Sequence, residues 1–90
     1  AKRNVMIHFK LRSLDIVDLT EQMRIWDEFQ LCIEKDLMFY QKAQAEMIDS
    51  QVRFPENAER FRILVEAYEL DIQIAKTKLI WIKKQIADRK

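Results

Sequence analysis

The chain has 90 residues, of which 49% are hydrophobic and 34% charged, and its net charge is +1. This length allows one small domain, and the absence of glycine excludes the glycine-rich loops that cradle phosphate groups. No run of about 18 uncharged apolar residues occurs, so we expect no membrane span. A single cysteine, Cys32, cannot form an internal disulfide, which favours a reducing, cytoplasmic setting.

The first segment, residues 4–14, is expected to form a short helix. Its apolar residues recur at roughly helical spacing, and they are Val5, Met6, Phe9 and Leu14. The stretch "VMIHF" taken alone also fits a short strand, and that alternative stays open.

A long helix is predicted from Asp18 to about Ser50. Asp18 precedes Glu21 by three positions, which is the capping-box arrangement with aspartate in the first place. The Asp18 carboxylate can accept from the free amides of the first turn, and Glu21 places negative charge at the positive end of the helix dipole. Apolar residues then keep helical phase along the segment, among them Leu19, Met23, Trp26, Ile33, Leu37, Tyr40 and Met47.

The only proline, Pro55, marks the boundary between this helix and the next. It disfavours helical geometry at Phe54 and fits the first turn of a following helix. We therefore predict a third helix from about Pro55 to Asp88, packed antiparallel on the second because the connection is so short. The expected fold is all-α: a short N-terminal helix plus a long antiparallel helical hairpin.

The charge is distributed unevenly along the chain. Residues 1–12 carry a net charge of +4, residues 13–71 carry −8, and residues 72–90 carry +5. Antiparallel packing would place the basic end of the third helix beside the acidic start of the second. The asymmetry therefore has a structural explanation that requires no nucleic acid.

Two apolar tracks run along the predicted third helix, and both advance by alternating steps of four and three. The first track consists of Phe61, Val65, Tyr68, Ile72, Ala75, Leu79, Ile82 and Ile86. The second track consists of Ile63, Ala67, Leu70, Ile74, Thr77 and Trp81. Because successive residues turn by about 100°, tracks offset by two positions lie about 160° apart, on nearly opposite faces.

The second helix can cover only one of these faces, and a first helix of about three turns can cover only part of the other. An apolar strip would then stay exposed on a monomer, and such patches usually mark interaction surfaces. Symmetric dimers are the commonest soluble oligomers, so we predict a homodimer that completes its core by association. The alternative is a monomeric three-helix bundle in which the first helix folds over the second track.

The residues expected at the dimer interface come mainly from the second track. They are Trp26, Phe29, Ile63, Ala67, Leu70, Ile74 and Trp81. Trp81 is the expected hot spot, because truncation of a buried interface tryptophan often costs about 2 kcal/mol or more.

The residues that could carry chemistry are isolated, so we predict no enzymatic activity, no catalytic residue, no cofactor and no metal site. His8 is the only histidine and has no further ligand at metal-binding spacing. Cys32 lies among apolar residues, where a structural thiol is expected. The basic C-terminal residues lack the zinc ligands or interleaved aromatic residues of an independent DNA-binding domain. The aromatic side chains offer one alternative site, a pocket between subunits for a small apolar ligand.

The predicted layout is a short helix, a capped long helix, a polar loop and a long helix with a late tryptophan. This layout resembles the C-terminal effector and dimerisation domain of PadR-type transcriptional regulators. The resemblance spans most of residues 5–86, and Trp81 matches the tryptophan near the end of that family's last helix. Three stretches carry it: "HFKLRSLDIVDLTEQMRIW", "LCIEKDLMFYQKAQ" and "RILVEAYELDIQIAKTKLIWIKKQI".

Two departures from that family limit the resemblance. The N-terminal winged helix-turn-helix is absent from this sequence. The small residue of the family's last helix has no obvious counterpart, and Ala67 and Asp71 stand in that region. The resemblance therefore implies that the chain is a fragment whose DNA-binding part lies upstream of Ala1.

Under that resemblance the chain would hold two DNA-binding domains in register, since half-site spacing on operator DNA depends on dimer geometry. DNA would be contacted only through the absent upstream domain, and sensing of a ligand would be a second role. The alternative function is a free-standing helical adaptor that binds a different protein through the exposed apolar face of its last helix.

Overall fold

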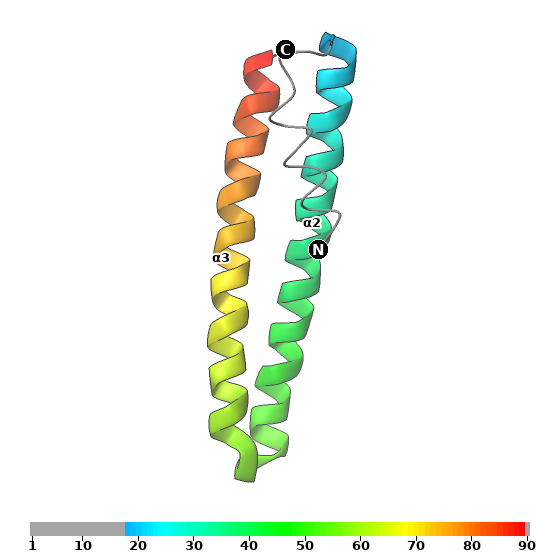
Figure 1. The fold of residues 1–90 in the computed structure, drawn as a ribbon. Helices are drawn as coiled ribbons and strands as arrows, with labels where there is room; N and C mark the ends of the chain where they lie inside the picture. The colour runs from blue at the N-terminus through cyan, green and yellow to red at the C-terminus, as the bar shows by residue number, and fades with distance from the viewer. Residues whose placement is uncertain (1–17, 90) are drawn as a thin grey trace.

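The computed structural model describes residues 18–89, which form two long α-helices joined by a short 3₁₀ turn (Figure 1). Helix α2 spans Leu19–Arg53, the turn η2 spans Pro55–Asn57, and helix α3 spans Ala58–Arg89. No strand occurs within the described part of the chain, so the predicted all-α class is confirmed for it. The helix predicted over residues 4–14 lies outside the described residues.

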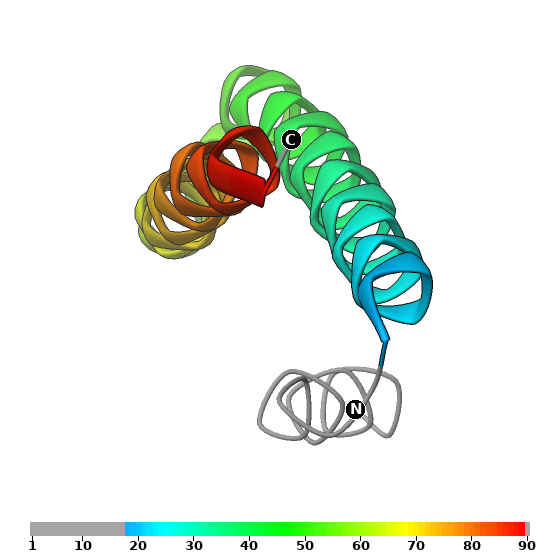
Figure 2. The ribbon, with the colours of Figure 1, turned by 90° about the horizontal axis from the view of Figure 1, so that it is seen from above.

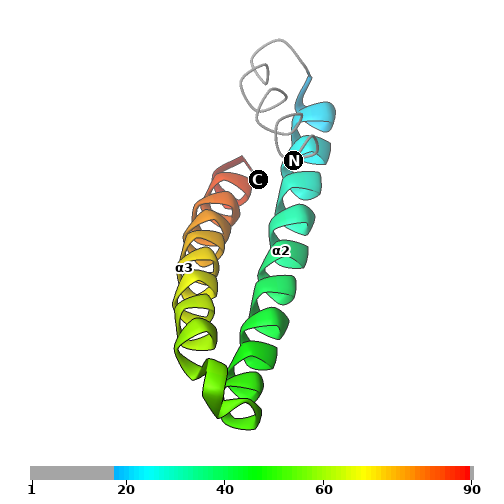
Figure 3. The same cartoon turned by 60° about the horizontal axis from the view of Figure 1, so that its bottom comes forward.

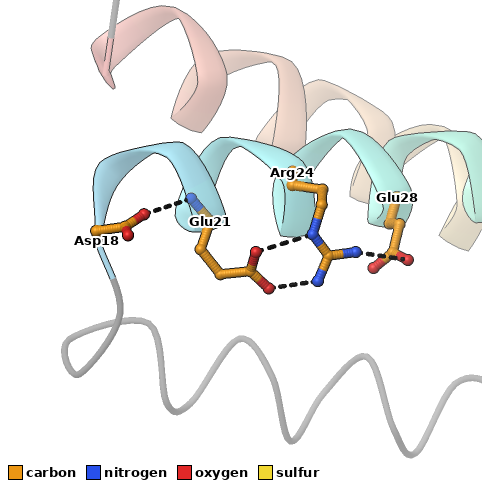
Figure 4. Close-up of polar contacts among 4 residues, drawn as sticks. All are labelled: Asp18, Glu21, Arg24 and Glu28. Carbon is orange, nitrogen blue, oxygen red and sulfur yellow. Dashed lines mark hydrogen bonds and ion pairs between the residues drawn. The ribbon is translucent and has the colours of Figure 1, made fainter.

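Helix α2 begins at the predicted cap. Asp18 has extended backbone (φ −72°, ψ 168°), and its carboxylate accepts a hydrogen bond from the Glu21 amide at 2.8 Å (Figure 4). Arg24 Nε donates to the Glu21 carboxylate at 2.9 Å, and Arg24 Nη1 donates to Glu28 at 3.3 Å. The hydrogen bond and the charge of Glu21 raise the pKa of the Arg24 guanidinium. Pairs at this spacing support the first turns of the helix.

Helix α2 ends at Arg53, three residues later than the predicted end at Ser50. The Phe54 amide still donates to the Ser50 carbonyl at 2.9 Å, so the helical hydrogen bonds continue to the last residue before the proline. Phe54 itself leaves helical geometry (φ −126°, ψ 72°), as the clash with the ring of Pro55 requires. The predicted boundary was early because a proline restricts only the residue that directly precedes it.

Helix α3 begins after the 3₁₀ turn, and not directly at Pro55. The Asn57 amide donates to the Phe54 carbonyl at 2.9 Å, which closes that turn before α3 starts at Ala58. The helix ends at Arg89, one residue beyond the predicted Asp88. Neither helix that the structure describes is long and apolar enough to cross a membrane.

The two helices lie side by side and run in opposite directions (Figures 1 and 3). Seen from above, their axes are tilted relative to each other (Figure 2). The molecule is long and thin, with extents of 56 × 25 × 14 Å. Its radius of gyration is 17.1 Å, whereas a compact domain of this length would have about 12 Å. Within the described residues, each helix therefore has only one other long helix to pack against.

Full burial is concentrated in the half of the helix pair that is remote from the turn. The core cluster joins Trp26, Phe29 and Ile33 of α2 to residues 75–86 of α3. Ile82 has no exposed surface at all. Within α3 the cluster members are Ala75, Leu79, Ile82 and Ile86.

Nearer the turn, the side chains that face the opposite helix are half-buried, and a polar link joins the two helices. Gln44 Nε2 donates to the Val65 carbonyl at 3.1 Å and to the Glu69 carboxylate at 3.0 Å. The rings of Tyr40 and Tyr68 lie 6.5 Å apart beside this link. The hydrogen bonds fix the pairing of the two helices where fully buried apolar side chains are scarce.

Candidate association surface

The first track of α3 supplies the contact with α2. Its members near the C-terminal end of α3 are buried, and those near the turn are half-buried. The buried members are Ile72, Ala75, Leu79, Ile82 and Ile86, and the half-buried members are Phe61, Val65 and Tyr68. This track is the hydrophobic stripe that an amphipathic helix needs for its partner within the same chain.

Every residue of the second track is exposed. The exposed fraction is 54% for Ile63, 62% for Leu70, 45% for Ile74 and 48% for Trp81. The two small members of the track, Ala67 and Thr77, are exposed as well. The track covers about 27 Å of helix length. Four large apolar side chains in one row therefore have no cover from α2, so they form the candidate association surface.

Trp81 connects the second track to the core. Its ring lies 5.4 Å from that of Trp26 at an interplanar angle of 60°, an edge-on arrangement. The Arg89 guanidinium lies 4.7 Å from the centre of the Trp26 ring, which adds a cation–π contact. One side of Trp81 thus packs on the core, and about half of the residue's surface stays exposed.

Two of the residues predicted for the interface lie in the core and not on the exposed surface. Trp26 is 2% exposed and Phe29 is 5% exposed, and both pack between the helices. The Trp26 indole N–H has no hydrogen-bond acceptor within the described part of the chain. Trp26 therefore supports the Trp81 ring from within the core, and neither Trp26 nor Phe29 is accessible at the surface.

A hollow of about 240 Å³ lies on the second track itself. It is lined by Gln73, Ile74, Thr77 and Lys78. These four residues occupy neighbouring positions on successive turns of α3, which is how the holes that receive side chains from a facing helix are built. The hollow is a shallow depression that a single apolar side chain could enter.

A second hollow, also about 240 Å³, lies in the groove between the helices and adjoins the second track at Ile74. Tyr40 lines it together with Asp36 and Asp71. Burial raises the pKa of the Tyr40 hydroxyl, and the charges of Asp36 and Asp71 raise it further. The remaining lining residues are Ile33, Ala75 and Lys78. The candidate association surface is therefore bordered by the negative charges of Asp36 and Asp71 and the positive charge of Lys78.

An apolar stripe on α2 escaped the sequence analysis. Leu31, Met38, Ala45 and Val52 follow one another at intervals of seven residues, and all four are exposed. The exposed fraction is 53% for Leu31, 69% for Met38 and 77% for Val52. The sequence did carry a signal for this stripe, namely the constant spacing of seven residues. Seven is the repeat of the apolar residues along a helix face that packs on another helix.

Among the remaining candidate residues, only Cys32 lies within the described part of the chain. Cys32 is a free, half-buried thiol packed against the core cluster, as a structural cysteine would be. Within residues 18–89, no group of three or more histidine, cysteine, aspartate or glutamate side chains is placed to hold a metal ion. His8 lies outside the described residues.

Comparisons of the chain with protein-family models, with curated proteins and with solved structures find no match.

Proposed function

We propose that this chain is a self-association module that uses the second track of α3 as its interface. The observation that carries the proposal is that every residue of that track, from Ile63 to Trp81, is exposed at regular helix-packing spacing. A row of large apolar side chains loses contact with water when a second helix covers it, and each fully covered side chain contributes about 1.5–3 kcal/mol. Two copies of the chain can cover each other's row at once.

The biological setting that fits this module best is the effector and dimerisation part of a PadR-like transcriptional regulator. The support is the resemblance in sequence, together with the order of a capped long helix, a short turn and a long last helix. In such a protein the module holds two DNA-binding domains in register on operator DNA. That setting predicts a winged-helix coding sequence directly upstream of the one for this chain.

The proposal is tested by sedimentation equilibrium from about 1 to 100 μM, a range chosen to bracket a micromolar dissociation constant. The parent chain is expected to be dimeric over most of that range. Leu70→Glu is expected to be monomeric, because it places a charge in the middle of the second track. Leu70 is 62% exposed, so the fold of the single chain does not depend on it. A parent chain that stays monomeric throughout would overturn the proposal.

The matched control is Met38→Glu, which places the same charge on the exposed stripe of α2. Met38 is 69% exposed and does not belong to the second track. The control is expected to dimerise as tightly as the parent. Loss of dimerisation in the control, with none in Leu70→Glu, would move the interface to α2.

The α2 stripe also favours a second candidate function, that of a helical adaptor. A homodimer through α3 leaves Leu31, Met38 and Val52 uncovered on each copy, so a further apolar surface remains for a different protein. Under this alternative, Met38→Glu abolishes capture of the partner and leaves the oligomeric state unchanged. The two functions are therefore separated by the same pair of variants.

A further inference from the structure

We infer that the two copies pair with their α3 helices antiparallel, in a register that places residue 70 of one copy against residue 74 of the other. This inference rests on the proposed self-association and specifies its geometry. It follows from three properties of α3: the order of residue sizes along the second track, the distribution of charge along the helix, and the position of the hollow at Ile74.

The second track is self-complementary when one copy is reversed. Antiparallel alignment about residue 72 makes each pair of facing positions sum to 144. Leu70 then faces Ile74, and the two small residues Ala67 and Thr77 face each other. The outermost layer pairs Ile63 with Trp81, so the strip is used along its whole length and no residue of the track lacks a counterpart.

The charge of α3 favours the same direction. Residues 58–71 contain four acidic and two basic side chains, which gives a net charge of −2, whereas residues 72–89 contain five basic and one acidic, which gives +4. Antiparallel pairing sets each half against the half of opposite sign, and parallel pairing sets like against like.

Individual charges at the ends and centre of the interface can be followed in this register. Arg60 of one copy lies opposite Lys84 of the other, just beyond each end of the second track, and both side chains are exposed, so solvent and salt screen their repulsion. The two Asp71 side chains approach each other near the twofold axis. Lys78 lines the same groove as Asp71 in each copy, so a cation is present to offset that repulsion.

The hollow on the second track lies where the register requires a hole. It is lined by residues 73, 74, 77 and 78 and has a volume of about 240 Å³. Leu70 of the second copy, placed opposite Ile74, is the side chain that would enter it. By symmetry each copy supplies one Leu70 and one hollow. The centre of the interface therefore contains two equivalent contacts, each with a Leu70 side chain in the hollow of the other copy.

Disulfide trapping tests the direction and the register. In a Cys32→Ala background, one chain carries Ala67→Cys and another, of different mass, carries Thr77→Cys. Both positions are exposed, so neither substitution disturbs the helix pair. After mixing and oxidation, the antiparallel register predicts that the mixed disulfide is the main product. Neither variant alone is expected to cross-link efficiently, because its two cysteines lie about ten residues, or roughly 15 Å, out of register.

The other outcomes distinguish an error in the inferred register from an error in the proposed self-association. Efficient cross-linking of each variant with itself would mean parallel pairing and would overturn this inference while the proposed dimer stands. A dimer by sedimentation with no cross-link of either kind would place the interface away from the second track. A monomer by sedimentation would overturn both proposals together.

Discussion

Two isoleucines two residues apart on α3 experience opposite environments. Ile82 has no exposed surface and lies in the core cluster, whereas Ile80 is 72% exposed. Ile82→Ala is expected to lower the free energy of unfolding by about 2–5 kcal/mol, because it removes buried methyl groups and leaves a cavity. Urea denaturation of a dilute sample measures this loss, and Ile80→Ala, the matched control, is expected to stay within about 0.5 kcal/mol of the parent. Equal losses in the two variants would show that the first track does not form the core.

A second residue-scale prediction concerns the cap of α2. Asp18→Ala is expected to cost about 1 kcal/mol of stability, because the Glu21 amide loses its acceptor. Asp18→Asn keeps a side-chain oxygen in the same place and should recover most of that loss. Thermal unfolding followed by circular dichroism measures both variants, and identical midpoints for alanine and asparagine would show that the cap contributes nothing.

At the scale of the element, the polar link between the helices should be visible in the titration of Glu69. Hydrogen bonds from Gln44 and Gln73 lower the pKa of this carboxyl group below 4.5. A carboxyl group whose pKa is lowered by folding stabilises the fold above its unfolded pKa, and the contribution is lost as the pH falls through the folded value. Gln44→Leu is therefore expected to raise the pKa of Glu69 and to reduce the loss of stability on acidification.

An NMR titration of the Glu69 side chain measures this shift directly. Gln41→Leu, an exposed position one turn earlier on α2, serves as the control and should leave the titration unchanged. An unchanged pKa in Gln44→Leu would mean that the contact across the helices does not persist in solution.

The elements were predictable from the sequence where a local signal marks them. Asp18 and Pro55 bound the two helices because capping and proline geometry act over one to three residues. The opposite faces of the two tracks followed from helix geometry alone. The burial of Trp26 could not be predicted, because it depends on how α2 and α3 tilt against each other. The stripe through Met38 was not predicted because its residues are out of phase with the apolar residues of α2 that form the core.

At the scale of the whole molecule, association and folding should be coupled. If the second track is covered only in the dimer, the dimer is more stable than the monomer, and its midpoint of thermal unfolding should rise with protein concentration. Calorimetry at about 1 and 100 μM measures this dependence, which Leu70→Glu is expected to abolish. A midpoint that does not change with concentration in the parent chain would show that the exposed track adds nothing to stability.

The start of α2 and the end of α3 lie at the same end of the molecule, opposite the turn (Figure 1). In the antiparallel pair, whose centre is residue 72, that end of each copy would lie about 25 Å from the twofold axis, since 17 residues separate the centre from Arg89. The pair would then be a rigid spacer, and domains attached to the open ends of the two copies would lie about 50 Å apart. Insertion of one heptad in each helix, between its open end and the interface, would increase the distance between the two open ends by about 21 Å. The contacts of the interface itself would not change.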